Sequence, residues 1–331
     1  MERADKAYTT DEILSRMEPL VSAWFRENFG SLTEPQAKAI PAIYQGRNVL
    51  VSSPTGSGKT LTAFTSILNR LIKYSSEGKL EERIYCVYIS PLKALANDVN
   101  RNLNEPLRQM RELAAREGMD VPDIRVAVRS GDTPQAERQK MARHPPHILI
   151  TTPESMALIL ASPKFKESLK DLEWLILDEI HDICDSKRGA FLSLTLEMLR
   201  DYCGHDFTRI GLSATMAPIE EIARYLVGFG KDGEPRDVTL VESDSKKVLD
   251  LEVICPTDDM TALPTDVVSS MMYDRLKELV EQHETTLVFT NTRSGAEAVV
   301  YKLKERGLEN IAVHHSSLGR EVSAKDRKSV V

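Results

Sequence analysis

Two adjacent carboxylates, Asp178 and Glu179, follow a run of four apolar residues in the stretch WLILDEIHDI. Such a run, with no polar alternation, indicates a strand that is buried on both faces, as in a parallel sheet covered by helices. The acids would lie at the carboxyl end of that strand, where open α/β sheets bind their ligands. Solvated loop acids are the plain alternative, whereas paired carboxylates at this edge could hold a divalent cation and activate a water molecule.

A second motif with possible chemistry, PTGSGKT, follows the β-like run at residues 48–53. Glycines in this motif allow a tight turn that brings backbone N–H groups against phosphate oxygens, and the next helix presents its positive end to the same anion. Ser53 stands where the strict phosphate-loop pattern has glycine. The strand before and the helix after still favour a nucleotide-binding loop over a merely structural glycine-rich turn. Its members are Thr55, Gly56, Ser57, Gly58, Lys59 and Thr60.

The two motifs together predict a site for ATP and Mg²⁺. Lys59 would contact the β- and γ-phosphates, and the Thr60 hydroxyl would bind Mg²⁺. Asp178 is suited to be the second protein ligand of the metal, and Glu179 is suited to orient or deprotonate the attacking water. Because parallel strands end at one edge of a sheet, we expect both carboxylates to reach a phosphate held by Lys59.

Three more polar residues follow the predicted strand ends. His181 lies just beyond the acids and is a plausible relay, although a lone histidine is usually a satisfied core or surface residue. Ser213 and Thr215 follow the next buried strand, in the stretch LSAT. Their short hydroxyls could bond the segment from Asp178 to His181 and couple its state to the rest of the molecule.

The order of elements predicts an α/β fold. Strand-like runs alternate with segments of helical period, which indicates βαβ units and a parallel sheet with helices on its faces. A polar, irregular stretch at 228–247 places a domain boundary near Ser245, so that the first domain is 1–245. Residues 246–331 then begin a second, incomplete α/β domain. The predicted strands are 48–53, 86–90, 124–128, 147–151, 174–178 and 209–213, followed by 249–255, 286–290 and 311–315.

Composition limits the partners. The 43 basic and 50 acidic residues give a net charge of -7, so any nucleic-acid binding must be local. The four cysteines lie far apart and form no C-x-x-C pair, which favours reduced thiols in a cytoplasmic protein. The charged start of the chain and the lack of a long apolar run favour neither export nor membrane insertion.

Three predicted helices begin where a hydroxyl residue precedes a proline. A capping residue followed by proline at the first helical position would point each helix N-terminus toward one edge of the molecule. The free N–H groups there could hold the phosphates of a nucleic acid with little sequence specificity, although ordinary capping explains each pair alone. The pairs are Ser90-Pro91, Thr133-Pro134 and Thr152-Pro153, with Lys93, Arg129 and Arg138 close by.

These residues resemble the motifs of superfamily 2 helicases, and several longer phrases are similar to the large helicase-related (Lhr) family. The similarity runs from about Leu32 to Leu318, and related archaeal repair helicases also carry DEIH-type sequences. It implies a P-loop NTPase of two RecA-like domains, with ATP in the cleft and a single strand that is tracked 3′ to 5′. The phrases are DEIH, YISPLKALAND, SGDTPQAERQ, ILITTPESMALIL, KRGAFLSLTLEMLR and RIGLSAT.

The resemblance also implies roles for residues outside the two motifs. Gln36, in LTEPQAKAI, is similar to the residue that reads adenine in this superfamily. In the second domain, Thr290, Asn291 and Arg293 stand where the family contacts its strand, and HHSSL resembles a further backbone contact. The implied strand contacts of the first domain are Pro91, Leu92, Lys93, Gly131, Asp132, Thr133, Thr151, Thr152, Pro153 and Glu154.

The predicted function is an ATP-driven helicase that separates DNA duplexes or RNA–DNA hybrids, with a cleft that opens and closes as ATP is bound and released. An ATP-gated clamp without processive movement would use the same residues. A small-molecule P-loop kinase would leave the capped helices unused.

Family members continue into two more motifs, whose arginines reach the γ-phosphate. Because such an arginine contributes about 10³–10⁵ in rate, we expect this chain to bind ATP, to hydrolyse it slowly and not to unwind. Multiple turnover at ordinary helicase rates would contradict that expectation.

Overall fold

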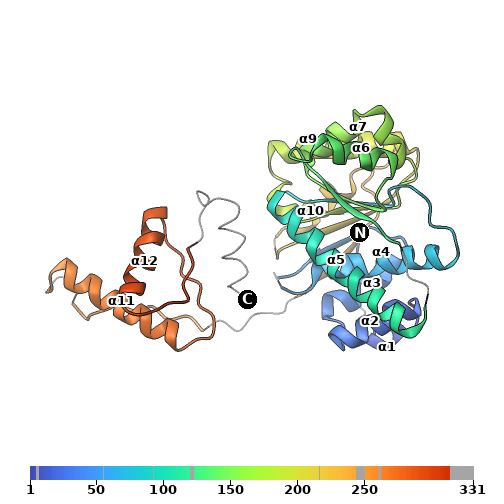
Figure 1. The fold of residues 1–331 in the computed structure, drawn as a ribbon. Helices are drawn as coiled ribbons and strands as arrows, with labels where there is room; N and C mark the ends of the chain where they lie inside the picture. Colours follow the sequence, from blue (N-terminus) through green and yellow to red (C-terminus); the bar gives the residue numbers. More distant parts are fainter. Residues whose placement is uncertain are drawn as a thin grey trace. The chain divides into compact units, whose positions relative to one another are not determined.

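The computed structural model describes residues 1–4, 7–54, 56–91, 93–119, 123–215, 217–243, 250–259 and 262–313 (Figure 1). The side chains of residues 93–98 and 100–102 lie outside this description. The chain divides into two compact units, Met1–Lys246 and Lys247–Val331.

The first unit is built on one parallel sheet, as the alternation of elements predicts. Eight strands of the described residues pair in the order β1-β8-β2-β7-β6-β3-β5-β4. Every pair is parallel, so all the carboxyl ends meet at one edge of the sheet. The strands are β1 Glu2–Arg3, β2 Val49–Ser52, β3 Cys86–Ile89, β4 Val126–Arg129, β5 Ile148–Thr151, β6 Trp174–Leu177, β7 Thr208–Ser213 and β8 Thr239–Glu242.

Helices cover both faces of this sheet (Figure 1). Side chains alternate along each strand, and in β2 they divide between two buried clusters, with Val49 and Val51 in one and Leu50 in the other. Helices α2 to α5 contribute to the first cluster, and α6 to α10 contribute to the second. The helices are α1 Thr10–Leu14, α2 Pro19–Phe29, α3 Glu34–Tyr44, α4 Lys59–Ser76, α5 Lys93–Glu117, α6 Gln135–Arg143, α7 Pro153–Leu160, α8 Pro163–Lys166, α9 Lys187–Cys203 and α10 Ile219–Val227.

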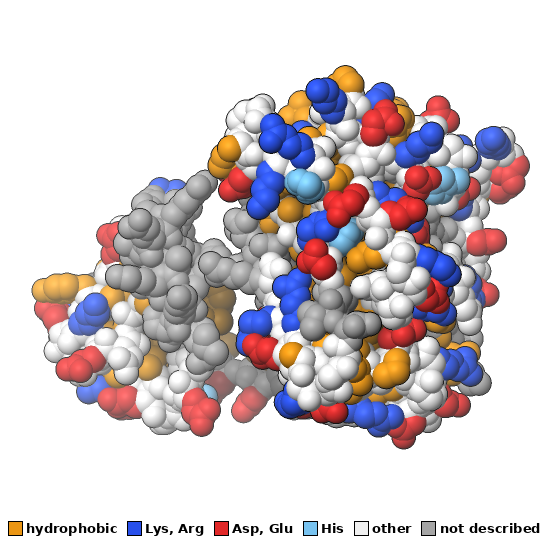
Figure 2. Space-filling model, turned by 45° about the vertical axis from the view of Figure 1, so that its right-hand side comes forward, with side chains coloured by type: hydrophobic (Ala, Val, Ile, Leu, Met, Phe, Trp, Pro, Cys, Tyr) orange, Lys and Arg blue, Asp and Glu red, His pale blue; other side chains and the backbone are white. Residues whose placement is uncertain are grey.

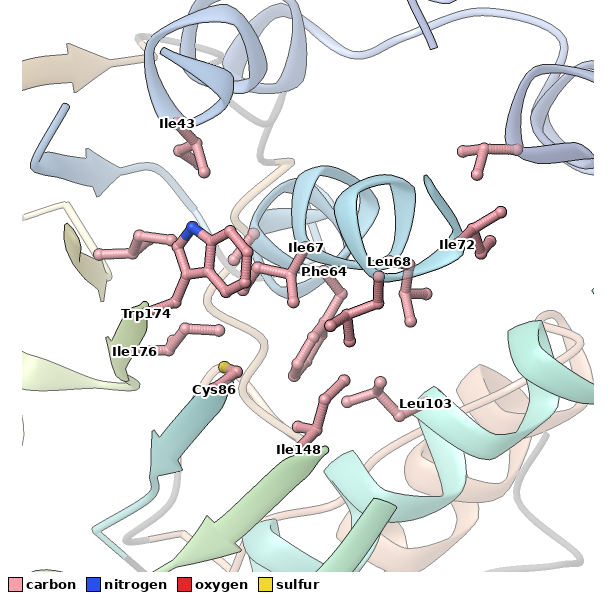
Figure 3. Packing of buried hydrophobic residues seen from close by; sticks show 14 of the residues in the cluster. Ile43, Phe64, Ile67, Leu68, Ile72, Cys86, Leu103, Ile148, Trp174 and Ile176 are labelled. Carbon is pink, nitrogen blue, oxygen red and sulfur yellow. The ribbon is translucent and has the colours of Figure 1, made fainter. Parts of the chain in front are cut away.

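Helix α4, which carries the predicted phosphate-binding lysine at its start, is anchored by its apolar stripe. Phe64, Ile67 and Leu68 project from α4 toward Cys86 of β3 and Ile176 of β6 (Figure 3). All five side chains are at least 97% buried. Because a densely packed core resists displacement of its helices, the N-terminus of α4 is held firmly at the edge of the sheet.

One strand of the sheet comes from a stretch that the sequence assigns to the passage between domains. Residues 239–242, a short β-like run within 228–247, form β8, which pairs with β2 and β1. The first three side chains of β8 are buried. Strand β2 would otherwise lie at an edge with unpaired backbone groups, so pairing with β8 satisfies them.

The second unit differs from its predicted structure. Helices α11 (Thr265–Glu281) and α12 (Arg293–Glu305) agree with the helical periodicity. The described residues of the predicted strands 249–255, 286–290 and 311–315 form no strand. Leu251 and Phe289 are 84% and 90% exposed. A β-like run becomes a strand only when another strand satisfies its backbone groups, and the described residues of this unit supply none.

Among the described helices, none has both the length and the apolar character that crossing a membrane requires.

Candidate active site

The predicted phosphate-binding loop joins the carboxyl end of β2 to α4. Gly56 and Gly58 both have a φ of +83°, a left-handed conformation that glycine adopts without strain. The Lys59 side chain is buried, and its Nζ donates a hydrogen bond to the Ser53 carbonyl at 2.5 Å. The loop therefore curls around the lysine ammonium. Thr55, a member of the predicted loop, lies outside the described residues.

Ser53 shows why the departure from the glycine pattern is tolerated. Its φ is not among the positive values of the described residues, so its backbone does not require glycine. Its hydroxyl lies 2.7 Å from the Ser57 hydroxyl, and its N–H donates to the Ser213 carbonyl at 3.2 Å. Ser53 thus stabilises the loop through contacts of its hydroxyl and its backbone N–H.

Asp178 follows β6, and hydrogen bonds fix its orientation. Its backbone N–H donates to the Ile89 carbonyl at 2.9 Å, its Oδ1 accepts from the Glu179 N–H at 3.0 Å, and its Oδ2 accepts from the Tyr88 hydroxyl. Burial raises the pKa of the Asp178 carboxyl, whereas the Tyr88 hydrogen bond lowers it. A buried carboxylate with lone pairs remaining is suited to a cation.

Glu179 occupies a strained backbone position. Its φ of +43° is the one positive value among the described residues other than glycine. Its Oε2 is buried and has no hydrogen-bond partner among the described residues. A left-handed non-glycine residue costs on the order of 1–3 kcal/mol and occurs where a function requires it. The unsatisfied oxygen is therefore available to a water molecule or a ligand.

The lysine and the two acids influence one another electrostatically. Burial lowers the pKa of Lys59, and the charges of Glu179 and Asp178 oppose that shift. In the sheet, however, β7 lies between β2 and β6, so the loop and the acidic pair are not on neighbouring strands. The end of β7 lies between the loop and the acidic pair.

The end of β7 joins the two motifs directly. The Ser52 hydroxyl donates to the Ala214 carbonyl at 3.3 Å. On the other side, the Ala214 N–H donates to His181 Nδ1 at 3.3 Å, and the Ser213 hydroxyl lies 3.4 Å from the same nitrogen. The predicted contact between Ser213 and the DEIH segment is therefore present, while Thr215 shows no described bond to that segment.

His181 lies close to both Glu179 and the end of β7. Glu179 Oε2 lies 3.4 Å from His181 Nδ1. The same nitrogen accepts the hydrogen bond from the Ala214 N–H. His181 thus bonds to the end of β7, and Glu179 Oε2 has no hydrogen-bond partner among the described residues.

Gln36, the predicted adenine contact, lies against the phosphate loop. Its Oε1 accepts from the Thr33 N–H at 2.9 Å, which closes the N-terminal cap of α3. Its Nε2 is so close to Gly58 that a Cβ at that glycine would meet it at 2.7 Å. The Thr33 hydroxyl donates to the Ser57 carbonyl at 3.1 Å. Helix α3 and the loop are thus packed as one piece.

The predicted strand contacts of the first unit follow three neighbouring strands, β3, β5 and β4. Thr151 and Thr152 are buried, and both hydroxyls are engaged within the fold. Thr151 Oγ1 donates to the Arg129 carbonyl at 2.7 Å, and Thr152 caps α7 by accepting from the Ser155 N–H. Pro153 is the first residue of α7, as predicted. Contact with a phosphate at this position would come from backbone N–H groups.

Two of the three predicted helix starts are wrong by one or two residues. Helix α6 begins at Gln135 with Pro134 as its N-cap, because Thr133 Oγ1 instead accepts from the Ser130 N–H at 2.9 Å. Helix α5 begins at Lys93, two residues beyond Pro91. Leu92 and the Lys93 side chain lie outside the described part.

The two arginines expected to add charge are partly occupied within the fold. Arg138 Nη2 donates to the Gly131 carbonyl at 2.8 Å and its Nε to the Thr133 carbonyl at 2.8 Å, which closes the loop that also contains exposed Asp132. Arg129 lies over the ring of Phe165, 4.2 Å from its centroid. On the face drawn in Figure 2, Lys and Arg side chains are interspersed with Asp and Glu.

Arg188 is a site residue that the sequence does not single out. From the first turn of α9, its Nη2 donates to the Pro91 carbonyl at 2.9 Å and its Nε to Glu154 at 2.7 Å. It ties together two of the predicted strand-contacting segments. The adjacent Gly189 makes this possible, because a Cβ there would meet the Ile183 carbonyl at 2.1 Å. The sequence signal for Arg188 is its place in the phrase KRGAFLSLTLEMLR, which is part of the family resemblance.

In the second unit, the predicted contacts gather at the start of α12. Thr292 caps this helix by accepting from the Gly295 N–H at 3.0 Å, and Thr290 Oγ1 donates to the Thr292 carbonyl at 3.0 Å. Asn291 and Arg293 flank the cap and are exposed. The HHSSL segment lies outside the described residues.

The candidate metal ligands fit Mg²⁺ held together with a nucleotide. Among the described residues, no group of three or more His, Cys, Asp and Glu forms a protein-only metal site. Mg²⁺ usually keeps several waters and binds through one or two carboxylates plus substrate phosphates. Asp178 and Thr60 offer hard oxygen atoms of this kind at the edge where Lys59 lies.

Comparison with known proteins identifies the family. The chain belongs to the DEAD/DEAH box helicases, whose family profile matches residues 33–222. It is 53% identical over 327 residues to the ATP-dependent helicase Lhr-Core of Methanothermobacter thermautotrophicus. That match covers 97% of this chain and 38% of the relative's length. The resemblance to Lhr helicases is thereby confirmed.

A solved structure agrees with this assignment. The Mycobacterium smegmatis helicase Lhr, bound to ssDNA and AMP-PNP, matches with a TM-score of 0.80 and 40% identity, over 96% of this chain and 40% of that one. The archaeal alternative is more distant, since the DNA helicase Hel308 of Thermoplasma acidophilum is 28% identical over 274 residues, 82% of this chain and 35% of that protein. The RecA-like α/β fold expected from sequence is present in the first unit.

Proposed function

We propose that this chain is the nucleotide-binding part of an ATP-dependent helicase that moves along a single nucleic-acid strand. The observation that supports it most strongly is the arrangement around Glu179: a buried, unpartnered carboxylate oxygen beside a buried lysine and a fixed aspartate. Such a set binds a magnesium nucleotide and orients water, which is what ATP hydrolysis requires.

Each residue has a distinct part in this proposal. Lys59 and the N-terminus of α4 bind the phosphates, and Gln36 contacts the adenine. Thr60 and Asp178 would hold Mg²⁺, which neutralises charge on the phosphates when it is bound. Glu179 aligns and deprotonates the attacking water through its free Oε2. His181 and Ser213 carry the state of this site to the end of β7.

The nucleic-acid strand would be held by phosphate contacts at the ends of β3, β5 and β4 in the first unit and at the start of α12 in the second. The relative bound to ssDNA supports a DNA strand, and the 3′ to 5′ direction and RNA–DNA hybrids follow from the family resemblance. ATP binding and release would alternate between states that grip and free the strand.

Nucleotide binding by the purified chain tests this proposal. A fluorescent ATP analogue with saturating Mg²⁺ should bind, and Lys59→Ala should weaken binding by about 10- to 100-fold through the loss of charge-assisted hydrogen bonds. Lys73→Ala is the matched control, because this lysine lies on the same helix and is partly exposed. Equal affinities of the two variants would overturn the assignment of the loop.

Strand displacement separates movement from clamping. In a version of the protein that displaces a labelled DNA strand, ATP should be required and Lys59→Ala should abolish displacement. ATP-dependent binding with no displacement would instead favour an ATP-gated clamp.

A further inference from the structure

Tyr88 is a buried polar residue in the middle of the site; it begins the phrase YISPLKALAND, but neither the sequence analysis nor the proposed mechanism gives it a role. It is the third residue of β3 and is completely buried. Its ring stacks on Phe64 of α4, with centroids 5.3 Å apart and an interplanar angle of 17°. Phenylalanine would fill this apolar space equally well, so the hydroxyl requires a separate explanation.

The hydroxyl bonds one of the two candidate metal ligands. It donates a hydrogen bond to Asp178 Oδ2. Asp178 follows β6, whereas the ring of Tyr88 stacks on Phe64 of α4, the helix that begins with Lys59 and Thr60. Tyr88 of β3 therefore contacts both elements that carry the candidate ligands.

The hydrogen bonds of Asp178 show what the Tyr88 hydroxyl contributes. The other carboxylate oxygen, Oδ1, is held by the Glu179 N–H, whose position depends on a strained backbone. Without Tyr88, Oδ2 would be buried with no described hydrogen bond, and the carboxylate could rotate about its last bond. Partners that orient a metal ligand in this way commonly contribute 10- to 100-fold in metal affinity.

We propose that Tyr88 is a positioning residue of the metal site: its hydroxyl holds the Asp178 carboxylate in the orientation that nucleotide-bound Mg²⁺ requires. This inference rests on the proposed ATP site and goes beyond it by assigning the residue that sets the metal geometry. Tyr88 touches neither the nucleotide nor the reacting water in this assignment.

The test is the Mg²⁺ dependence of nucleotide binding, a readout that a purely structural role would not change. Binding of a fluorescent ATP analogue is titrated with Mg²⁺ for the wild-type chain, Tyr88→Phe and Tyr85→Phe. Tyr85 is the matched control, because it is also buried but its hydroxyl bonds elsewhere. That hydroxyl accepts from the Glu81 N–H at 2.8 Å, in the segment that precedes β3. Unfolding temperatures by circular dichroism verify that each variant is folded.

We expect the Mg²⁺ midpoint to rise by about tenfold or more in Tyr88→Phe and to stay within twofold of wild type in Tyr85→Phe. An unchanged midpoint in Tyr88→Phe, with nucleotide still bound, would overturn the role of Tyr88 and leave the ATP site intact. Failure of the wild-type chain to bind the analogue at any Mg²⁺ concentration would overturn both.

A double-mutant cycle gives a second, independent measurement. Asp178→Ala removes the acceptor and should raise the Mg²⁺ midpoint, and adding Tyr88→Phe should then have little further effect, because the hydroxyl acts through that carboxylate. Fully additive effects of the two substitutions would contradict the proposal.

Discussion

The two halves of the sheet edge use different chemistry. At β2, β7 and β6, charged side chains converge: Lys59, Asp178 and Glu179 are buried or partly buried and influence one another. At β3, β5 and β4, the predicted strand contacts have side chains turned into the fold, such as the Thr151 hydroxyl on the Arg129 carbonyl. The same parallel strands thus present side chains in one half and backbone in the other.

This difference agrees with the two ligands that we propose. A triphosphate with a metal must be held in one geometry for reaction, which requires directed, ionised side chains. A strand that slides past the protein requires contacts that repeat and ignore the base, and helix N-termini supply them without a basic surface. Substitutions should therefore affect the first half through their chemistry and the second through backbone placement.

The largest expected effect is on the chemistry of the first half. Glu179→Gln keeps the shape of the side chain and removes its basicity, so single-turnover hydrolysis should fall by about 10²–10⁴ while nucleotide affinity stays within a few-fold. Single-turnover conditions make even slow hydrolysis measurable. Glu173→Gln, at the opposite end of β6, is the control and should hydrolyse normally. Similar rates for the two variants would remove Glu179 from the reaction.

The stability of the folded chain should depend on pH through His147, a residue that takes no part in the candidate site. His147 precedes β5 at the opposite edge, where its Nδ1 accepts from the Arg125 N–H at 3.1 Å. Burial first, and then the Arg125 charge, lower its pKa from 6.5 to about 4. Between these values the unfolded chain binds a proton that the folded chain does not. The stabilisation is therefore complete above pH 6.5 and is lost as the pH falls toward 4.

Chemical unfolding at pH 7 and pH 5 measures this effect. The wild-type chain should lose on the order of 2 kcal/mol of unfolding free energy over this interval through His147. His147→Gln should have a correspondingly flatter pH dependence. Identical pH profiles of the two proteins would show that His147 titrates normally in the folded state.

A smaller effect should follow from the cap of α7. Thr152→Ala removes the acceptor for the Ser155 N–H and should weaken the first turn of the helix by about 1 kcal/mol. If this turn holds a phosphate, affinity for a labelled single-stranded oligonucleotide should fall by up to about fivefold. Fluorescence anisotropy measures it. Thr152→Ser keeps the hydroxyl, so weakening in that variant too would argue against a backbone role.

The smallest expected effect concerns Arg188, whose ion pair with Glu154 is partly exposed. Such exposed pairs contribute a few tenths of a kcal/mol, so Arg188→Gln should reduce oligonucleotide affinity by about twofold and leave nucleotide affinity unchanged. Lys187→Gln removes the same charge from the neighbouring residue. Equal losses in both variants would indicate a general charge effect and no bridging role.

Local signals predicted much of the first unit. Each predicted strand of the sheet from 48–53 to 209–213 overlaps an observed one, because a buried parallel strand is a continuous apolar run. The prediction that Lys59 and the acids share one edge of the sheet came from the parallel arrangement, although β7 lies between their strands. The roles assigned to these residues stay predictions.

The features that sequence reasoning missed depend on contacts between residues far apart in the chain or on the choice between two local bonds. Strand β8 was hidden in a polar stretch, and its pairing with β2 depends on residues almost two hundred positions away. Thr133 could cap a helix or bond its own loop, and only the position of Ser130 decides between them. Tyr88 resembles any core aromatic until the Asp178 carboxylate is placed beside its hydroxyl.

The last residues of the first unit have a mechanical consequence. Strand β8 runs parallel to β2, and just beyond it the Ser243 N–H bonds the Ser52 carbonyl while its hydroxyl donates to Glu34. Tension applied through the following segment would load the β8–β2 hydrogen bonds together, in shear, and they would resist as a group. Force would thus enter the first unit at a rigid attachment one strand away from the glycine-rich loop that follows β2.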